Sequence, residues 1–134
     1  HLINYRCGTG HSVSFVGNVH EGPHALNGRN TTLMRPGMIV TDEPGVYETD
    51  LVGIRIENEL VCVHKADNQY GTFLGFEPIM FVPIATSPIV PGVLTKDELD
   101  WLNNYHRQVF EKLAPRLNDE ERDWLAKKCA AIGC

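Results

Sequence analysis

Residues 53–64 read GIRIENELVCVH, and this stretch decides how the rest of the sequence is interpreted. Apolar and polar side chains alternate along it, which is the period of a β-strand with two unlike faces. One face collects the apolar side chains of Ile54, Ile56, Leu60 and Cys62. The other face collects the charged side chains of Arg55, Glu57 and Glu59. We therefore predict one continuous strand from Gly53 to His64.

A shorter apolar run precedes this strand. Residues 38–41 read MIVT and predict a buried strand, which Pro44 ends. If the two strands pair as a hairpin about Asp50, Glu43 and Glu57 lie directly opposite each other. Bare like charges in opposed positions destabilise a sheet by up to ~1 kcal/mol. The pairing therefore predicts either two solvated side chains or two carboxylates with a cation between them.

The cation interpretation needs further ligands, and His11 can supply a nitrogen after the turn-like segment 8–10 (GTG). Carboxylates with one imidazole suit a divalent ion such as manganese, cobalt or zinc. The simpler alternative is that Glu57 and Glu59 form a solvated strand face, with Glu43 in a turn. Exposed carboxylates are common and a single histidine is more often structural, so the pattern alone favours this alternative.

The segment His20–His24 reads HEGPH and matches the zinc-protease pattern H-E-x-x-H. That motif works on a helix, where residues four apart share a face. Proline in a helix interior costs ~3 kcal/mol, and the adjacent glycine costs about 1 kcal/mol more. The segment is therefore predicted not to form a helical zinc site.

Composition describes an ordinary globular chain of 134 residues, enough for one modest domain, with a net charge of −5. Its 12 Lys and Arg residues are scattered, which argues against nucleic acid or anionic membrane as a partner. It has no membrane-spanning run and no signal peptide, and its start at His1 suggests a piece of a longer protein. Its four cysteines form no C-x-x-C pair and are expected to be free thiols: Cys7, Cys62, Cys129 and Cys134.

Residues 1–34 are expected to form short strands linked by loops, and residues 72–85 one or two further strands. The pattern then changes to helical spacing. Thr95 with Glu98, and Asn118 with Glu121, have the spacing of capping boxes that open two helices. Apolar residues follow at helical spacing: Leu99, Leu102, Tyr105, Val109 and Leu113 in the first, and Trp124, Leu125 and Ile132 in the second. Pro115 separates the two helices. We predict an α+β chain with a β-rich part at 1–87 and a helical part at 88–134.

Five strings in this order resemble one enzyme family: GTGH (8–11), NVHEGP (18–23), GMIVTDEPGVY (37–47), GIRIENELV (53–61) and FEPIMFVPI (76–84). They are similar to the C-terminal part of the catalytic domain of X-prolyl aminopeptidases (aminopeptidase P). These are dinuclear metallopeptidases of the creatinase-like, pita-bread type. LTKDELDWLNNYH (94–106) resembles the C-terminal extension of the eukaryotic cytosolic form. The resemblance implies a partial pita-bread fold, a curved antiparallel sheet followed by a helical tail, in which HEGPH is a loop.

The resemblance also implies roles for individual residues. His11 matches a metal-binding histidine, and Glu43 matches a metal ligand that is also the general acid/base. Glu57 matches the carboxylate that bridges two divalent ions, with manganese expected and zinc or cobalt as alternatives. His20 matches a histidine that contacts the substrate near the scissile bond.

Three further positions complete the expected substrate pocket. Tyr47 and Arg55 match members of the polar network beside the metals. Cys7 stands where the family usually has histidine, so the pocket departs from the family pattern there. The family's two aspartate ligands and a further histidine lie upstream of GTGH, so this chain holds three of the five expected ligands.

The implied protein is a cytoplasmic enzyme that cleaves peptides with proline at the second position. A homodimer is expected through the C-terminal part, where four aromatic residues are available: Trp101, Tyr105, Phe110 and Trp124. The chain alone is expected to be inactive. Two alternatives remain open, a prolidase that accepts only dipeptides and a non-catalytic peptide-binding or protein-binding module.

Overall fold

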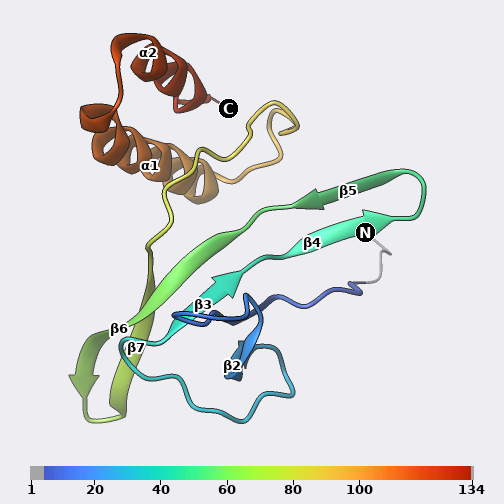
Figure 1. The fold of residues 1–134 in the computed structure, drawn as a ribbon, viewed down its shortest axis with the longest axis vertical. Coiled ribbons are helices and arrows are strands. Elements are labelled where there is room, and N and C mark those ends of the chain that lie inside the picture. Colours follow the sequence, from blue (N-terminus) through green and yellow to red (C-terminus); the bar gives the residue numbers. More distant parts are fainter. Residues whose placement is uncertain (1–4, 134) are drawn as a thin grey trace. The chain divides into compact units, whose positions relative to one another are not determined.

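The computed structural model describes residues 5–133, and the thiol predicted at Cys134 lies outside this range. The chain divides into two compact units, residues 1–80 and 81–134. The first is built of strands and the second of helices (Figure 1). Among the described residues, no helix has both the length and the apolar character needed to cross a membrane. The fold class predicted from the sequence, α+β with the strands first, is confirmed.

The first unit contains an antiparallel sheet with the order β2-β1-β3-β6-β7. Its strands are β1 (Gly10–Ser12), β2 (Glu21–Leu26), β3 (Ile39–Asp42), β6 (Asn58–Asn68) and β7 (Gly71–Pro78). A separate two-stranded sheet pairs β4 (Gly45–Glu48) with β5 (Val52–Arg55). Buried Val40 and Cys62 lie on the central strands β3 and β6.

The continuous strand predicted from Gly53 to His64 is wrong, because β5 ends at Arg55 and β6 begins at Asn58. Two features of the opposing chain interrupt the ladder. Pro44 has no N–H to donate, and the N–H of Glu43 donates to the carbonyl of Thr9 at 2.6 Å. Ile54 and Ile56 are each 52% exposed, so neither belongs to the buried face that the alternation predicted.

The hairpin predicted about Asp50 is confirmed, and its register continues across this break. Asp42 pairs with Asn58 on one side, and Gly45 pairs with Arg55 on the other. Counting inward from both ladders brings Glu43 and Glu57 to opposed positions. The register thus agrees with the sequence analysis although the strands belong to two different sheets.

The HEGPH segment is not helical, as its proline predicted, but the expected loop is largely the strand β2. Only His20 precedes the strand, and the Gly22–Pro23 bond is cis. The imidazole Nε2 of His24 donates to the carbonyl of Ile39 at 2.7 Å, so this side chain links β2 to β3. The two histidines of the motif therefore have different surroundings.

The helical unit begins each of its helices at the predicted capping box. Helix α1 (Lys96–Leu113) is capped by Thr95 and helix α2 (Asp119–Lys128) by Asn118, with the 3-10 turn η1 (Ala114–Arg116) between them. Ile132 was predicted to lie on the second helix, but it follows the end of α2. Its backbone N–H and C=O are instead bound by the side-chain amide of Asn103, both at 3.0 Å.

The core of this unit consists of Tyr105, Val109 and Leu125. Phe81 and Ile84 pack against this core, so residues that the sequence analysis grouped with the sheet belong to the helical unit by contact. The domain boundary predicted between residues 87 and 88 stays a prediction. Tyr105 also hydrogen-bonds the backbone of the extended segment, donating its hydroxyl to the carbonyl of Val82 at 2.9 Å.

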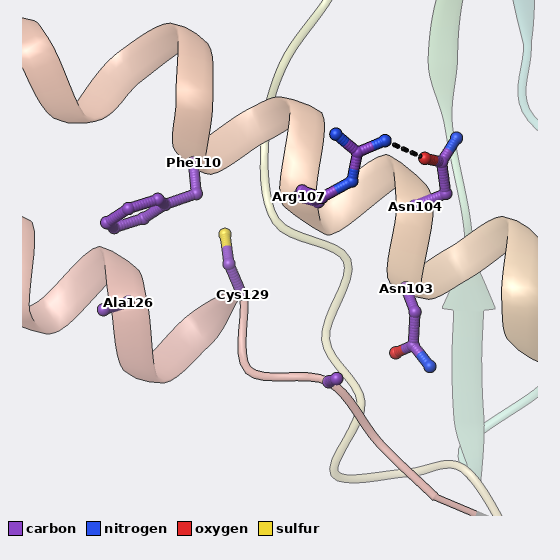
Figure 2. Close-up of a pocket in the computed structure, with 7 residues that line it drawn as sticks. Asn103, Asn104, Arg107, Phe110, Ala126 and Cys129 are labelled. Carbon is purple, nitrogen blue, oxygen red and sulfur yellow. Dashed lines mark hydrogen bonds between the residues drawn. The ribbon is translucent and has the colours of Figure 1, made fainter.

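An open cavity of about 560 Å³ lies in the helical unit (Figure 2). Its wall combines apolar and polar side chains: Asn103, Asn104, Arg107, Phe110, Ala126, Cys129 and Ala131. Arg107 is engaged within this wall, since its guanidinium donates to the side chain of Asn104 and to Glu111. None of the predicted site residues lines the cavity, so it does not mark the expected metal centre.

His106 is fully buried in α1, and its Nε2 accepts the N–H of Ile84 at 3.1 Å. Burial lowers the pKa of His106 below its ordinary value of 6.5, so the folded state holds the imidazole neutral. The unfolded chain takes up the proton first, and the stability of the folded chain therefore falls as pH decreases below about 6.5.

We expect His106→Gln, which keeps a hydrogen-bond acceptor but does not titrate, to flatten this pH dependence. Tryptophan fluorescence during urea unfolding between pH 8 and pH 5 would measure it. Both tryptophans of the chain, Trp101 and Trp124, lie in the helical unit and report on it directly. Equal slopes of stability against pH in the two proteins would contradict this assignment.

Candidate metal centre

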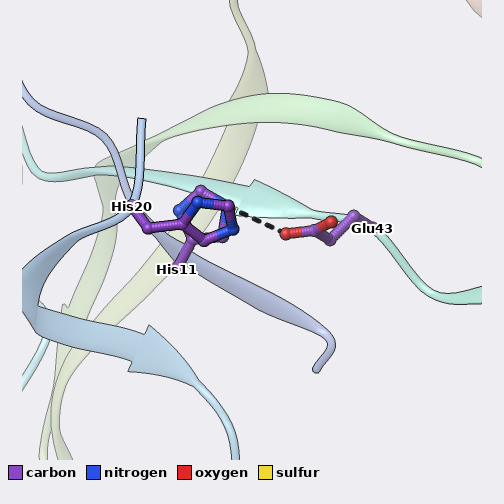
Figure 3. A group of neighbouring side chains, drawn as sticks. All are labelled: His11, His20 and Glu43. Atoms are coloured by element: carbon purple, nitrogen blue, oxygen red, sulfur yellow. Dashed lines mark ion pairs between the residues drawn. The ribbon is translucent and has the colours of Figure 1, made fainter. Parts of the chain in front are cut away.

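Three potential ligands converge in the first unit (Figure 3). His11 lies on β1, His20 directly precedes β2, and Glu43 directly follows β3. One ligand atom from each lies within 4.8 Å of the others. His11 and Glu43 were predicted to be ligands, and His20 was predicted to contact substrate. The structure brings all three together.

The hydrogen bonds of His11 determine which ring nitrogen is available. Its Nδ1 lies 2.9 Å from the carbonyl oxygen of Ser12, which can only accept, so Nδ1 carries a proton. Nε2 points to Oε1 of Glu43 at 2.9 Å (Figure 3). With the ring proton on Nδ1, Nε2 of His11 and a carboxylate Oε1 of Glu43 are both acceptors, so their contact needs either a proton or a cation between them. Metal-binding histidines commonly donate their other N–H to a carbonyl in this way. The donor set therefore fits a divalent ion.

Thr41 connects the two principal ligands and was not among the residues predicted from the sequence. Its hydroxyl accepts the backbone N–H of His11 at 3.0 Å and lies 3.1 Å from Oε1 of Glu43, to which it can donate. The strand register explains this position: Ser12 pairs with Val40, so the preceding residue of β1 faces the following residue of β3. Thr41 also lies two residues before Glu43, the spacing of one strand face.

His20 differs from the other two in exposure. Its ring lies over that of His11, with centroids 3.9 Å apart and planes inclined by 32°. His11 and Glu43 are about four-fifths buried, whereas His20 is exposed. The outer position of His20 leaves its ring accessible to a molecule that approaches from solvent.

The remaining predicted site residues form a second group around the β4–β5 hairpin. Arg55 donates through Nε to Oε2 of Glu57 at 3.1 Å. A hydrogen bond and electrostatic interaction with Tyr47, followed by the charges of Glu57 and Glu43, raise the pKa of Arg55. The thiol of Cys7 donates to the carbonyl of Gly45 at 3.0 Å. Within the described residues, Glu57 is thus held by an arginine and is not a member of the converging group.

Models of one peptidase family match two long segments of the chain. Residues 2–64 match metallopeptidase family M24, and residues 72–132 match the C-terminal region of peptidase M24. The chain belongs to metallopeptidase family M24.

The curated relatives of this chain are considerably longer than it is. Aminopeptidase P2 of Arabidopsis thaliana is 46% identical over 92% of this chain and 18% of its own length. A probable Xaa-Pro aminopeptidase P of Coprinopsis cinerea is 41% identical over 97% of this chain and 22% of its own length. The chain therefore spans about a fifth of the length of the curated relatives that it matches.

A solved structure of a longer protein has a region of similar fold to this chain. The X-prolyl aminopeptidase of Caenorhabditis elegans superposes with a TM-score of 0.85 at 37% identity, over 98% of this chain and 22% of that one. It is described as a cytosolic enzyme with a di-nuclear active site. The predicted partial pita-bread fold is confirmed by this likeness.

Proposed function

We propose that this chain is the C-terminal, metal-binding part of an Xaa-Pro aminopeptidase, which removes an N-terminal residue that precedes proline. The observation that carries the proposal is the contact of His11 Nε2 with Glu43 Oε1, with the proton of His11 fixed on Nδ1. The similarity to aminopeptidase P2 and to a probable Xaa-Pro aminopeptidase P supports the substrate class. The activity, substrates and partners belong to the longer protein.

Two divalent ions are the proposed cofactor, and His11, Glu43 and Glu57 would hold them from this chain. Nitrogen and carboxylate donors suit manganese, with zinc or cobalt as alternatives. The opposed positions of Glu43 and Glu57 in the hairpin register support a bridging role for Glu57. In that role Glu57 would exchange its contact with Arg55 for the ions, and Arg55 would remain a neighbouring cation that limits the local negative charge.

The ions, when bound, supply polarisation of the scissile carbonyl and activation of water. The residues of this chain are proposed to accept the proton of the water and to contact the substrate. Oε1 of Glu43 is already engaged by Thr41 and His11, so Oε2 is the oxygen proposed to accept the proton of the attacking water. His20, exposed beside His11, is proposed to contact the substrate near the scissile bond. Cys7, Tyr47 and Arg55 are proposed to line the pocket.

The proposed location is the cytoplasm, because the solved relative is described as a cytosolic enzyme. Peptides with proline in second place are the proposed partners, together with a second copy of the protein bound through the helical unit. Trp101 and Trp124, which are 56% and 57% exposed, are the aromatic side chains available for that interface. Tyr105 and Phe110 belong to the packing of the helical unit instead.

The longer enzyme and the 134-residue chain are expected to behave differently in one assay. With manganese and a tripeptide that has proline in second place, the longer enzyme should release the first residue and lose this activity to a chelator. The chain alone should release no measurable amount of the first residue, because displacing a catalytic group by only ~1 Å already costs about 100-fold in rate.

Other outcomes of this assay separate the alternatives. Cleavage of Xaa-Pro dipeptides but not of tripeptides would identify a prolidase. Metal binding without any hydrolysis by the longer protein would favour a non-catalytic module. Sustained, chelator-sensitive release by the chain alone would contradict the proposal that residues outside it are indispensable.

A further inference from the structure

The hydroxyl of Thr41 lies within hydrogen-bond distance of both the backbone of His11 and the side chain of Glu43. It is enclosed, since Thr41 is only 3% exposed. Its oxygen accepts the backbone N–H of His11 at 3.0 Å and lies 3.1 Å from Glu43 Oε1 and 3.4 Å from the carbonyl of His11. The single hydroxyl proton goes to one acceptor, and the nearer one is the carboxylate, which also accepts more strongly.

From this geometry, and resting on the proposed function, we infer that Thr41 is a positioning residue that determines which carboxylate oxygen of Glu43 faces His11. The hydroxyl holds Oε1 beside Nε2 of His11, with which it makes the 2.9 Å contact. Oε2 receives no hydrogen bond from the described residues. The hydrogen bond from Thr41 therefore gives the two carboxylate oxygens different roles. Oε1 faces His11 and the proposed metal site, and Oε2 stays available to accept the proton of the attacking water.

The position of Thr41 in the sheet makes this assignment rigid. Thr41 belongs to β3, which pairs with β6 on one side and β1 on the other. Glu43 lies beyond the end of β3, where the ladder has stopped, so its side chain depends on local hydrogen bonds for its orientation. A hydroxyl fixed by the central part of the sheet can supply that orientation, because a buried β-branched side chain has few rotamers.

Three substitutions in the full-length protein test the inference. Thr41→Val keeps the shape and removes the hydroxyl, whereas Thr41→Ser keeps the hydroxyl. Thr72→Val is the matched control, because Thr72 makes the same kind of bond, to Asp67 at 2.7 Å, at the far end of the β6–β7 hairpin. Calorimetric titration with manganese and separate kcat and KM values for a tripeptide with proline in second place are the measurements.

We expect Thr41→Val to weaken manganese binding by about 10- to 100-fold, the usual effect of losing a group that orients a metal ligand. We expect kcat to fall while KM for the peptide changes little, since Thr41 does not contact substrate. Thr41→Ser should recover most of both quantities, because it keeps the hydroxyl and lacks only the methyl group that restricts its rotamers. Thr72→Val should leave both at the wild-type values. If Thr41→Val fails to fold by circular dichroism, Thr41→Cys replaces it, with a weaker donor of similar volume and an intermediate loss.

Three results would overturn the inference: wild-type manganese affinity in Thr41→Val, an equal loss in Thr41→Ser, or an equal loss in Thr72→Val. Failure of the proposed function has a different signature. A wild-type protein that binds manganese but leaves proline peptides intact would refute the peptidase activity, while the titrations would still decide the role of Thr41. A wild-type protein that binds no manganese would overturn both.

Discussion

Replacing Glu43 with glutamine in the full-length enzyme is expected to lower kcat for an Xaa-Pro peptide by about 10²- to 10⁴-fold, the usual contribution of a positioned general base. The amide of glutamine cannot take the proton of the attacking water. It also removes the negative charge that lies 2.9 Å from His11 Nε2, so manganese binding should weaken as well. The side-chain oxygen can still accept from Thr41, and the local fold should therefore persist.

The matched control for this change is Glu48→Gln, on an exposed glutamate of β4. It alters the net charge equally but lies at the turn end of the hairpin. Steady-state kinetics and the manganese content of both variants would be measured together. Near-wild-type kcat in Glu43→Gln would remove Glu43 from the proposed mechanism, and an equal loss in Glu48→Gln would show a general effect of charge.

Gly10→Ala is expected to disrupt the same centre through the backbone rather than through a ligand. An added Cβ at this position would lie 1.8 Å from the carbonyl oxygen of Thr41 and 2.8 Å from its carbonyl carbon. Backbone atoms cannot rotate away as a flexible side chain would, so β1 must move from β3. That movement separates His11 from Thr41. We expect a loss of about 3 kcal/mol in stability, the upper part of the range for overpacking.

Gly28→Ala provides the control for this second variant, because an added Cβ at Gly28 would meet no atom within 4 Å. It should stay within about 0.5 kcal/mol of the wild type, as most surface substitutions do. Urea unfolding measures stability, and titration with manganese measures the centre. A Gly10→Ala protein with wild-type stability and manganese affinity would mean that β1 and β3 do not approach as closely as the structure describes.

Local signals in the sequence predicted the features that depend on few residues. Thr95 and Asn118 cap the two helices because each capping box is complete within four residues. The hairpin register also follows from local information, since one turn at Asp50 relates every pair on both strands. These elements were predictable without knowledge of distant contacts.

Features that depend on distant chain segments were not predictable in the same way. The break before Asn58 arises because the N–H of Glu43 bonds to Thr9, more than thirty residues earlier. Thr41 was missed for the same reason, as its importance appears only when β1 pairs with β3. The pairing of Glu57 with Arg55 likewise depends on how the chain turns where β5 ends, which alternation of side chains does not encode.

The shared register of the two ladders has a consequence for how this hairpin can change in evolution. Residues inserted at the turn around Asp50 leave the ladders, and the opposition of Glu43 and Glu57, as they are. A single residue added to one strand beside the break would offset the partners beyond it and turn their side chains to the other face. The number of residues in the turn can thus vary freely. An insertion or deletion in one strand near Glu43 or Glu57 requires a matching insertion or deletion in the facing strand.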